Sequence, residues 1–167
     1  MLIQAAEDRF NRGLVALKDG RGLEALALFE AAVELARRLG SRTPQGRYLS
    51  YYGLCIATEG NRQREGTELC RQAIAIEFFN ADLYWNYGRV LLMSDRKKDA
   101  FVAFVKGLSM QKNHQEILRE LRRMGWRRRP VLSFLPRTNP INIALGRLLR
   151  PGTAPSFLRQ QPPKTVV

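Results

Sequence analysis

The residues best suited to chemistry are five arginines that surround one tryptophan. Guanidinium groups neutralise phosphates and other anions, and an indole ring can stack on a base. Ten basic residues and no acidic residue follow Glu120, an asymmetry typical of a segment with an anionic partner. A solvated basic face is the simpler alternative and stays open. The candidate anion-binding residues are Arg122, Arg123, Trp126, Arg127, Arg128 and Arg129.

Other reactive side chains are too sparse for catalysis. The only histidine is His114, and the two cysteines, Cys55 and Cys70, stand far from it and from each other. These spacings match no metal site, and the chain has no nucleophile elbow, zinc-protease motif or phosphate-binding loop. We therefore predict no enzymatic activity, no metal and no cofactor.

Composition indicates one domain with a basic extension. The chain has 167 residues and a net charge of +13, and it contains no secretory signal and no apolar run that could span a membrane. Two cysteines inside helical patterns are expected to be small core residues in a reducing compartment. These observations predict a cytoplasmic protein.

Three segments of the chain share one pattern, at residues 9–36, 49–77 and 83–110. Each has a glycine in a first helix, then a small residue and a larger one in a second helix. Small residues let two antiparallel helices approach closely, and the larger residue fills the remaining space. The three sets are Gly13, Ala25 and Phe29; Gly53, Gly66 and Cys70; and Gly88, Ala100 and Phe104.

This pattern resembles the tetratricopeptide repeat. The resemblance implies an all-α solenoid of about seven helices with a basic, proline-interrupted C-terminal extension. The departures from the family pattern include Arg9 and Arg37 in the first repeat, a long connection at residues 40–46, an extra residue around Gly60–Asn61, and Cys70 in a large slot. A seventh helix over residues 113–125 is expected to cap the array, with Asn113 and Glu116 forming a capping box.

The expected organisation has three parts. Residues 1–125 form the repeat domain with its capping helix. Residues 126–152 form a basic strap with a short amphipathic helix, which we expect to dock on the repeats. A partner protein or an acidic membrane are the other surfaces considered for the strap. Residues 153–167, rich in proline, are expected to be disordered.

The resemblance also implies that the first helix of each repeat lines a concave groove that binds a peptide. One subset of the family holds chaperone C-terminal carboxylates in a clamp of Lys, Arg and Asn residues. Phe10, Leu14, Tyr51, Asp82 and Asn86 stand at those positions here, so we exclude that ligand. Tyr51 and Trp85 could instead be core residues. The expected groove residues are Phe10, Asn11, Leu14, Arg47, Tyr51, Leu54, Trp85, Asn86 and Arg89.

The predicted function is that of a non-catalytic adaptor or scaffold that holds a partner polypeptide in this groove. The alternative is a binder of nucleic acid or acidic membrane through residues 119–129. The sequence identifies neither the partner nor the anion.

Overall fold

The computed structural model describes residues 2–38 and 45–124, and these residues form seven helices and no strand. All seven lie in one compact unit, Met1–Gly125. The expected strap and tail, residues 126–167, lie outside the described residues. The helices are α1 (Leu2–Lys18), α2 (Gly22–Arg38), α3 (Gly46–Thr58), α4 (Gln63–Ile76), α5 (Ala81–Met93), α6 (Lys97–Met110) and α7 (Gln115–Arg123).

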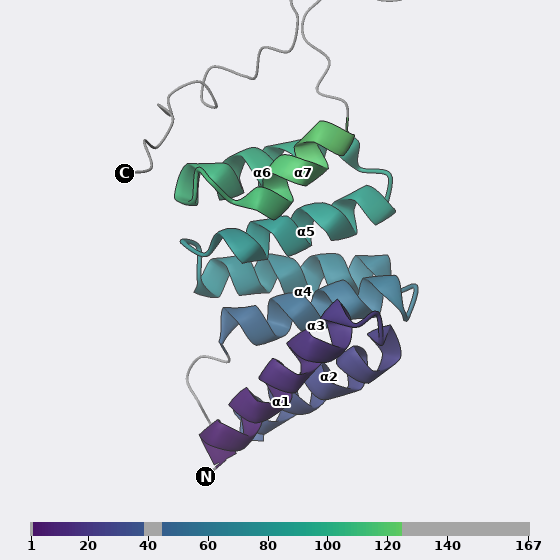
Figure 1. Ribbon diagram of the computed structural model, residues 1–167, viewed down its shortest axis with the longest axis vertical. Helices are drawn as coiled ribbons and strands as arrows, with labels where there is room; N and C mark the ends of the chain where they lie inside the picture. Colours follow the sequence, from purple (N-terminus) through teal and green to yellow (C-terminus); the bar gives the residue numbers. More distant parts are fainter. Residues whose placement is uncertain (1, 39–44, 125–167) are drawn as a thin grey trace, which may run out of the picture. The chain divides into compact units, whose positions relative to one another are not determined.

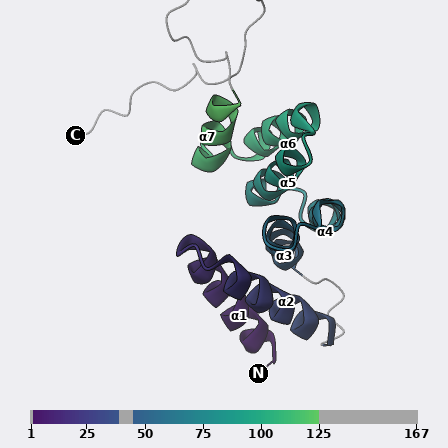
Figure 2. The same ribbon diagram turned by 90° about the vertical axis from the view of Figure 1, so that its right-hand side faces the viewer.

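The helices pack as successive antiparallel pairs, α1 with α2, α3 with α4, and α5 with α6 (Figure 1). Helix α3 also contacts α2 and α5, α4 contacts α5, and α7 contacts α6. Viewed at right angles, α3 lies to the left of α4 and α7 to the left of α6, whereas α5 lies below α6 (Figure 2). We call the surface carried by α1, α3, α5 and α7 the odd-helix face and the surface carried by α2, α4 and α6 the even-helix face.

Close contact between a glycine and a ring joins the helices of the first and third pairs. A Cβ atom added at Gly13 would lie 2.7 Å from Cε1 of Phe29, and one added at Gly88 would lie 2.7 Å from Cδ1 of Phe104. Both rings are completely buried. Any side chain larger than hydrogen would therefore push the helices apart.

The helices of the second pair, α3 and α4, approach each other closely without a glycine–ring contact. The large slot of this pair holds Cys70, and Gly53 of α3 faces Gly66 of α4 so closely that an added Cβ at Gly53 would lie 2.9 Å from the carbonyl oxygen of Gly66. Two facing glycines bring the backbones nearer, and a smaller side chain then suffices to fill the gap.

Each pair closes through a turn with one residue in the left-handed region: Gly20, Asn61 or Asp95. In the first turn the amide of Arg21 donates to the carbonyl of Ala16 and that of Gly20 to Leu17, which is a Schellman motif. The third turn repeats this arrangement. In the second turn the amide of Arg62 donates to the carbonyl of Ile56, which lies one residue further back in the chain than the acceptors in the other two turns. The extra residue in this turn of the sequence accounts for the difference.

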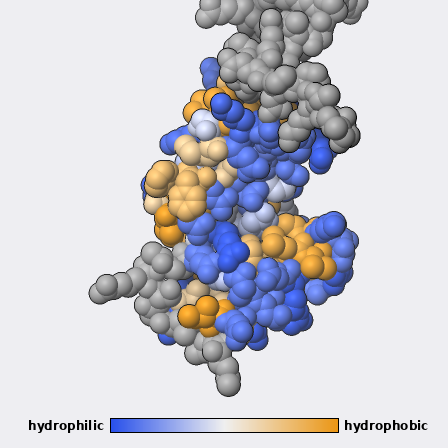
Figure 3. Space-filling view, turned by 60° about the vertical axis from the view of Figure 1, so that its left-hand side comes forward, coloured by the Kyte–Doolittle hydropathy of each residue, from blue (hydrophilic) through white to orange (hydrophobic). Residues whose placement is uncertain are grey.

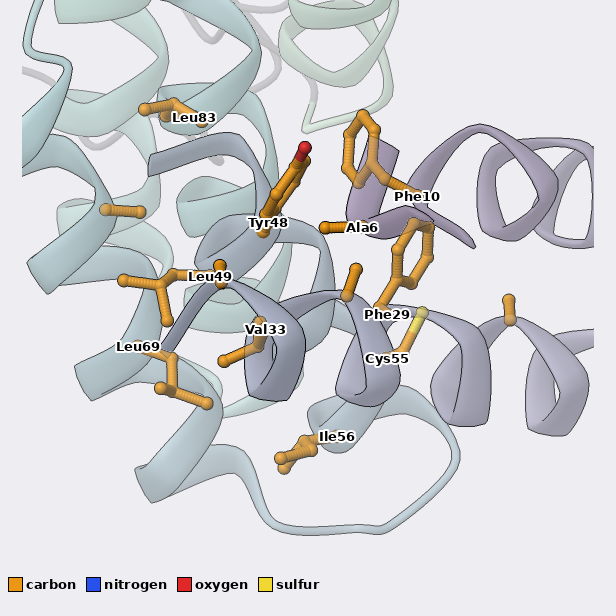
Figure 4. Close-up of a cluster of buried hydrophobic side chains, with 14 of the residues drawn as sticks. Ala6, Phe10, Phe29, Val33, Tyr48, Leu49, Cys55, Ile56, Leu69 and Leu83 are labelled. Atoms are coloured by element: carbon orange, nitrogen blue, oxygen red, sulfur yellow. The ribbon is translucent and has the colours of Figure 1, made fainter. Parts of the chain in front are cut away.

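An aromatic cluster connects the first pair to the second. The ring of Phe10 lies 5.5 Å from Phe29, 4.9 Å from Tyr48 and 5.6 Å from Tyr51, centroid to centroid. Figure 4 shows Phe10, Phe29 and Tyr48 converging from α1, α2 and α3. Buried aromatic side chains contribute large apolar areas, so this cluster stabilises the junction between the pairs.

The last helix begins one residue later than the sequence pattern predicts. Its N-cap is His114, not Asn113, and Nδ1 of His114 accepts a hydrogen bond of 3.3 Å from the amide of Ile117. The expected capping box of Asn113 and Glu116 is therefore wrong. His114 occupies the N-cap position because its ring is buried, at 3% exposure, and its other ring nitrogen, Nε2, is hydrogen-bonded to Asp82.

Both cysteines are free thiols in the interior, as the sequence predicts. Burial raises the pKa of Cys55 to about 12 and that of Cys70 to about 12. A raised pKa means that the thiol form dominates at all pH values below that range, so neither sulfur is a nucleophile near neutral pH.

The glycine contacts predict the effect of one methyl group. Gly88→Ala should lower the free energy of unfolding by about 1–3 kcal/mol, because the added methyl collides with a buried ring. This loss should appear although alanine normally favours a helix over glycine by about 1 kcal/mol. Urea unfolding followed by circular dichroism measures the change. Gly22→Ala is the control, since its methyl meets only the flexible carboxylate of Glu59; an equal loss in both variants would contradict the packing argument.

The buried thiols predict a difference in reactivity between the folded and unfolded protein. In mildly alkaline buffer, Ellman's reagent should modify neither Cys55 nor Cys70 in the native chain and both after denaturation in guanidinium, because a raised pKa and burial together suppress the thiolate. Absorbance of the released thiolate measures the reaction. Rapid modification of a native thiol would show that the site opens readily.

Candidate functional site

The odd-helix face carries most of the side chains that the sequence places in a groove. Asn11 is exposed, and Leu14, Arg47, Tyr51, Trp85 and Arg89 are partly exposed. They come from α1, α3 and α5, which are the first helices of the three pairs. The arrangement therefore offers partly exposed aromatic and aliphatic surface accompanied by cations.

Three expected groove residues do not offer a surface. Phe10 is 2% exposed, and Leu54 and Asn86 are completely buried. The aromatic cluster of α1, α2 and α3 encloses Phe10, and Leu54 packs against Cys70 and Val90. The candidate contact set is therefore reduced to the six exposed or partly exposed residues, with these three supporting them from beneath.

Asn86 forms a buried polar link between two helices. Its Nδ2 donates a hydrogen bond of 3.1 Å to Oγ of Ser50, which is also completely buried. Burying polar groups costs free energy unless they are paired, so this bond favours one alignment of α3 against α5. Asn86 thus sets the spacing between Tyr51 and Trp85, which are carried by those helices.

Arg47 is already occupied within the protein. Its guanidinium donates to Oε2 of Glu7 at 2.7 Å, and its Cζ lies 5.2 Å from the ring centroid of Phe10. The hydroxyl of Tyr48 donates to the same carboxylate oxygen at 2.6 Å. Burial, and then the hydrogen bond to Glu7, raise the pKa of Tyr48 to about 12. Arg47 is therefore a compensated charge and a poor receptor for a further anion.

Trp85 lies at the centre of the remaining surface. Cζ of Arg89 is 5.0 Å from its ring centroid, a cation–π arrangement. No carboxylate pairs with Arg89 in the described part of the chain. The ring of His114 lies 6.2 Å away, so α7 also borders this surface.

Charged groups of both signs surround Trp85 and Tyr51. Nε2 of His114 lies 2.8 Å from Oδ1 of Asp82, and Nδ1 lies 3.4 Å from Oε2 of Glu116. Because Nδ1 accepts from the amide of Ile117, the neutral ring carries its proton on Nε2 and donates to Asp82. Burial, and next the charge of Asp82, raise the pKa of Tyr51, so its hydroxyl stays protonated.

Two buried polar atoms beneath this surface lack a hydrogen-bond partner in the described part of the chain. Within residues 2–38 and 45–124, Nε1 of Trp85 is buried and has no hydrogen-bond acceptor, and Oδ1 of Asn86 has no donor. Indole N–H groups usually find an acceptor when they are buried. Both atoms are buried, so a ligand on the surface cannot reach them unless the side chains above them move.

Two residues beside this surface, His114 and Glu116, were not predicted as groove residues from the sequence. Asp82 stands at a groove position of the third repeat but was not kept among the expected contact residues. The signal that could have found them is the spacing of 32 residues between Asp82 and His114, which places both at the start of their helices in successive repeats.

The candidate anion-binding residues are only partly described. Arg122 and Arg123 are exposed in the last turn of α7, and Arg123 pairs with Glu120 at 3.1 Å. Trp126, Arg127, Arg128 and Arg129 lie outside the described residues. The anion-binding hypothesis for this cluster stays a prediction.

The described residues form neither a metal-binding cluster nor a membrane-spanning helix. Residues 2–38 and 45–124 contain no group of three or more histidine, cysteine or carboxylate side chains that could hold a metal ion. None of the seven helices has both the length and the apolar composition needed to cross a membrane.

Comparison with known proteins identifies the fold. No protein-family model matches the sequence, and no curated protein matches it. Among solved structures, the chain is similar to the Arabidopsis OM64 TPR domain, with a TM-score of 0.60 and 18% sequence identity over 74% of this chain and 97% of that one. At this identity the likeness bears on the fold alone. Together with the paired helices and their repeated small-to-large contacts, it shows that the chain has a tetratricopeptide-type fold.

Proposed function

We propose that the odd-helix face binds a partner polypeptide and that the protein acts as a non-catalytic adaptor or scaffold. The observation that carries this proposal is Trp85: its ring is partly exposed, and a cation that has no carboxylate partner in the described part of the chain lies over it. Trp, Tyr and Arg are the residues that most often dominate binding energy at protein interfaces.

The chemistry of the surface favours a polypeptide over a plain anion. Tyr51, Leu14 and Trp85 supply apolar contact, and Arg89 supplies one uncompensated positive charge. Asp82 and Glu116 place negative charge at the same site, which would repel a polyanion. A peptide offers apolar side chains for the aromatic and aliphatic contacts and main-chain carbonyl groups that can accept hydrogen bonds from Arg89.

A cytoplasmic location is part of the proposal. The two free, buried thiols are compatible with a reducing compartment, and the tetratricopeptide-type fold generally serves protein–protein interaction.

The test uses the full chain with Trp126→Phe, which leaves Trp85 as the only tryptophan. Peptides selected from a displayed library on this protein should shift the emission of Trp85 to shorter wavelength, because binding covers its ring. In the otherwise unaltered chain, Trp85→Ala should weaken binding of the same peptides by about 2 kcal/mol, or about thirtyfold, as measured by calorimetry. Tyr51→Ala should weaken it in the same direction.

Leu23→Ala is the matched control, since Leu23 is 70% exposed on α2 and lies outside the odd-helix face; its affinity should equal that of the parent. Equal affinity of Trp85→Ala and the parent would overturn the proposal. Binding that falls steeply with salt and disappears when Arg127, Arg128 and Arg129 are replaced would instead favour the anion-binding hypothesis.

A further inference from the structure

The even-helix face contains a cleft that the proposed polypeptide site does not use. It lies between α4 and α6, has a volume of about 330 Å³, and has two tyrosines of α5, Tyr84 and Tyr87, in its lining. Ile74 of α4 and Val102 of α6 also line it. This volume is at the small end of the range for ligand pockets, so the cleft fits one or two side chains.

The cleft and the odd-helix face lie on opposite sides of the same helix. Tyr87 is two residues from both Trp85 and Arg89, and residues two positions apart point about 200° away from each other around an α-helix. A ligand in the cleft therefore cannot touch Trp85. The two surfaces can be tested independently.

An exposed aliphatic side chain borders the cleft. Val102 is 64% exposed on α6, whereas Ala103 beside it is buried. Large apolar side chains exposed next to a hollow favour covering by a partner, because covering removes apolar area from water. Figure 3, a view of one face, shows apolar patches of this general kind set in a mostly hydrophilic surface.

Cations outnumber carboxylates in the lining, at Arg71, Arg96 and Lys106 against Asp99. Arg96 is paired with Asp99 at 2.7 Å, and Arg71 with Glu68 at 2.7 Å. The hydrogen bond from Arg71 lowers the pKa of Glu68 to about 2, so that carboxylate is charged near neutral pH. Lys106 has no carboxylate partner in the described residues, and its Nζ lies 5.7 Å from the ring centroid of Tyr84.

We propose that this cleft binds an acidic peptide segment, with an apolar or aromatic side chain inserted between Val102 and the tyrosines and a carboxylate paired with Lys106. A single uncompensated cation beside an apolar hollow matches this chemistry. A nucleic acid fits less well, because two of the three cations are neutralised by carboxylates.

The chain's own C-terminal segment is a poor occupant on grounds of charge. Residues 125–167 contain eight basic residues and no acidic residue, so they would bring like charge to Lys106. A separate acidic polypeptide is the occupant to which the proposal commits.

The probe is a short fluorescein-labelled peptide with a central Phe-Leu pair and acidic residues on both sides. Binding to the full chain is measured by fluorescence anisotropy. The acidic peptide should bind, and Val102→Glu and Lys106→Glu should each weaken it by at least about tenfold. Both substituted positions are exposed, so the variants should fold, which circular dichroism checks. Peptides in which lysines replace the acidic residues, or serines replace Phe-Leu, should not bind.

Two control variants separate this site from general effects. Lys18→Glu reverses an exposed charge on α1 and should leave affinity unchanged, and Leu23→Ala, which removes an exposed apolar side chain of α2, should do the same. Absence of binding, or equal binding of the acidic and lysine peptides, would overturn the proposal. Loss of binding in Trp85→Ala with no effect of Val102→Glu would assign the acidic peptide to the odd-helix face instead.

Discussion

The distance between paired helices is the constraint on which the remaining structure depends. Gly13 against Phe29 and Gly88 against Phe104 hold two pairs at a separation that no larger residue allows. The facing glycines of α3 and α4 achieve the same closeness by a different route. These contacts set the spacing within each pair, and with it the positions of the side chains that successive odd-numbered helices carry. Both proposed binding surfaces depend on that spacing.

The two sides of α5 show how one helix can serve two surfaces. On the odd-helix face α5 carries Trp85, with the guanidinium of Arg89 above its ring. On the opposite side α5 carries Tyr84 and Tyr87, which line the cleft between α4 and α6. Between them, Asn86 and Ser50 form the buried bond that aligns α5 with α3. A change in that alignment would alter both surfaces together, although a ligand can contact only one of them.

The sequence predicted the fold because its strongest pattern reports directly on contact between neighbouring helices. The spacing of Gly88, Ala100 and Phe104 indicates how two neighbouring helices pack. Contacts between helices that are adjacent in the sequence can be predicted from such spacing. The binding surface was harder to predict. Phe10 and Leu14 share one side of α1, yet Phe10 is buried because rings from two other helices enclose it. The cap at His114 likewise depends on Asp82, a contact 32 residues away that no local pattern contains.

The turns within the pairs carry a consequence for how such a chain changes over evolutionary time. After each left-handed residue stands an arginine that pairs with a carboxylate three residues later: Arg21 with Glu24, Arg62 with Glu65, and Arg96 with Asp99. Each hairpin is thus closed by groups that it supplies itself. A self-closed unit can be duplicated or deleted without leaving a neighbour's turn incomplete, so arrays of this kind can lengthen by gene duplication while each new copy keeps its own side-chain surface for a different partner.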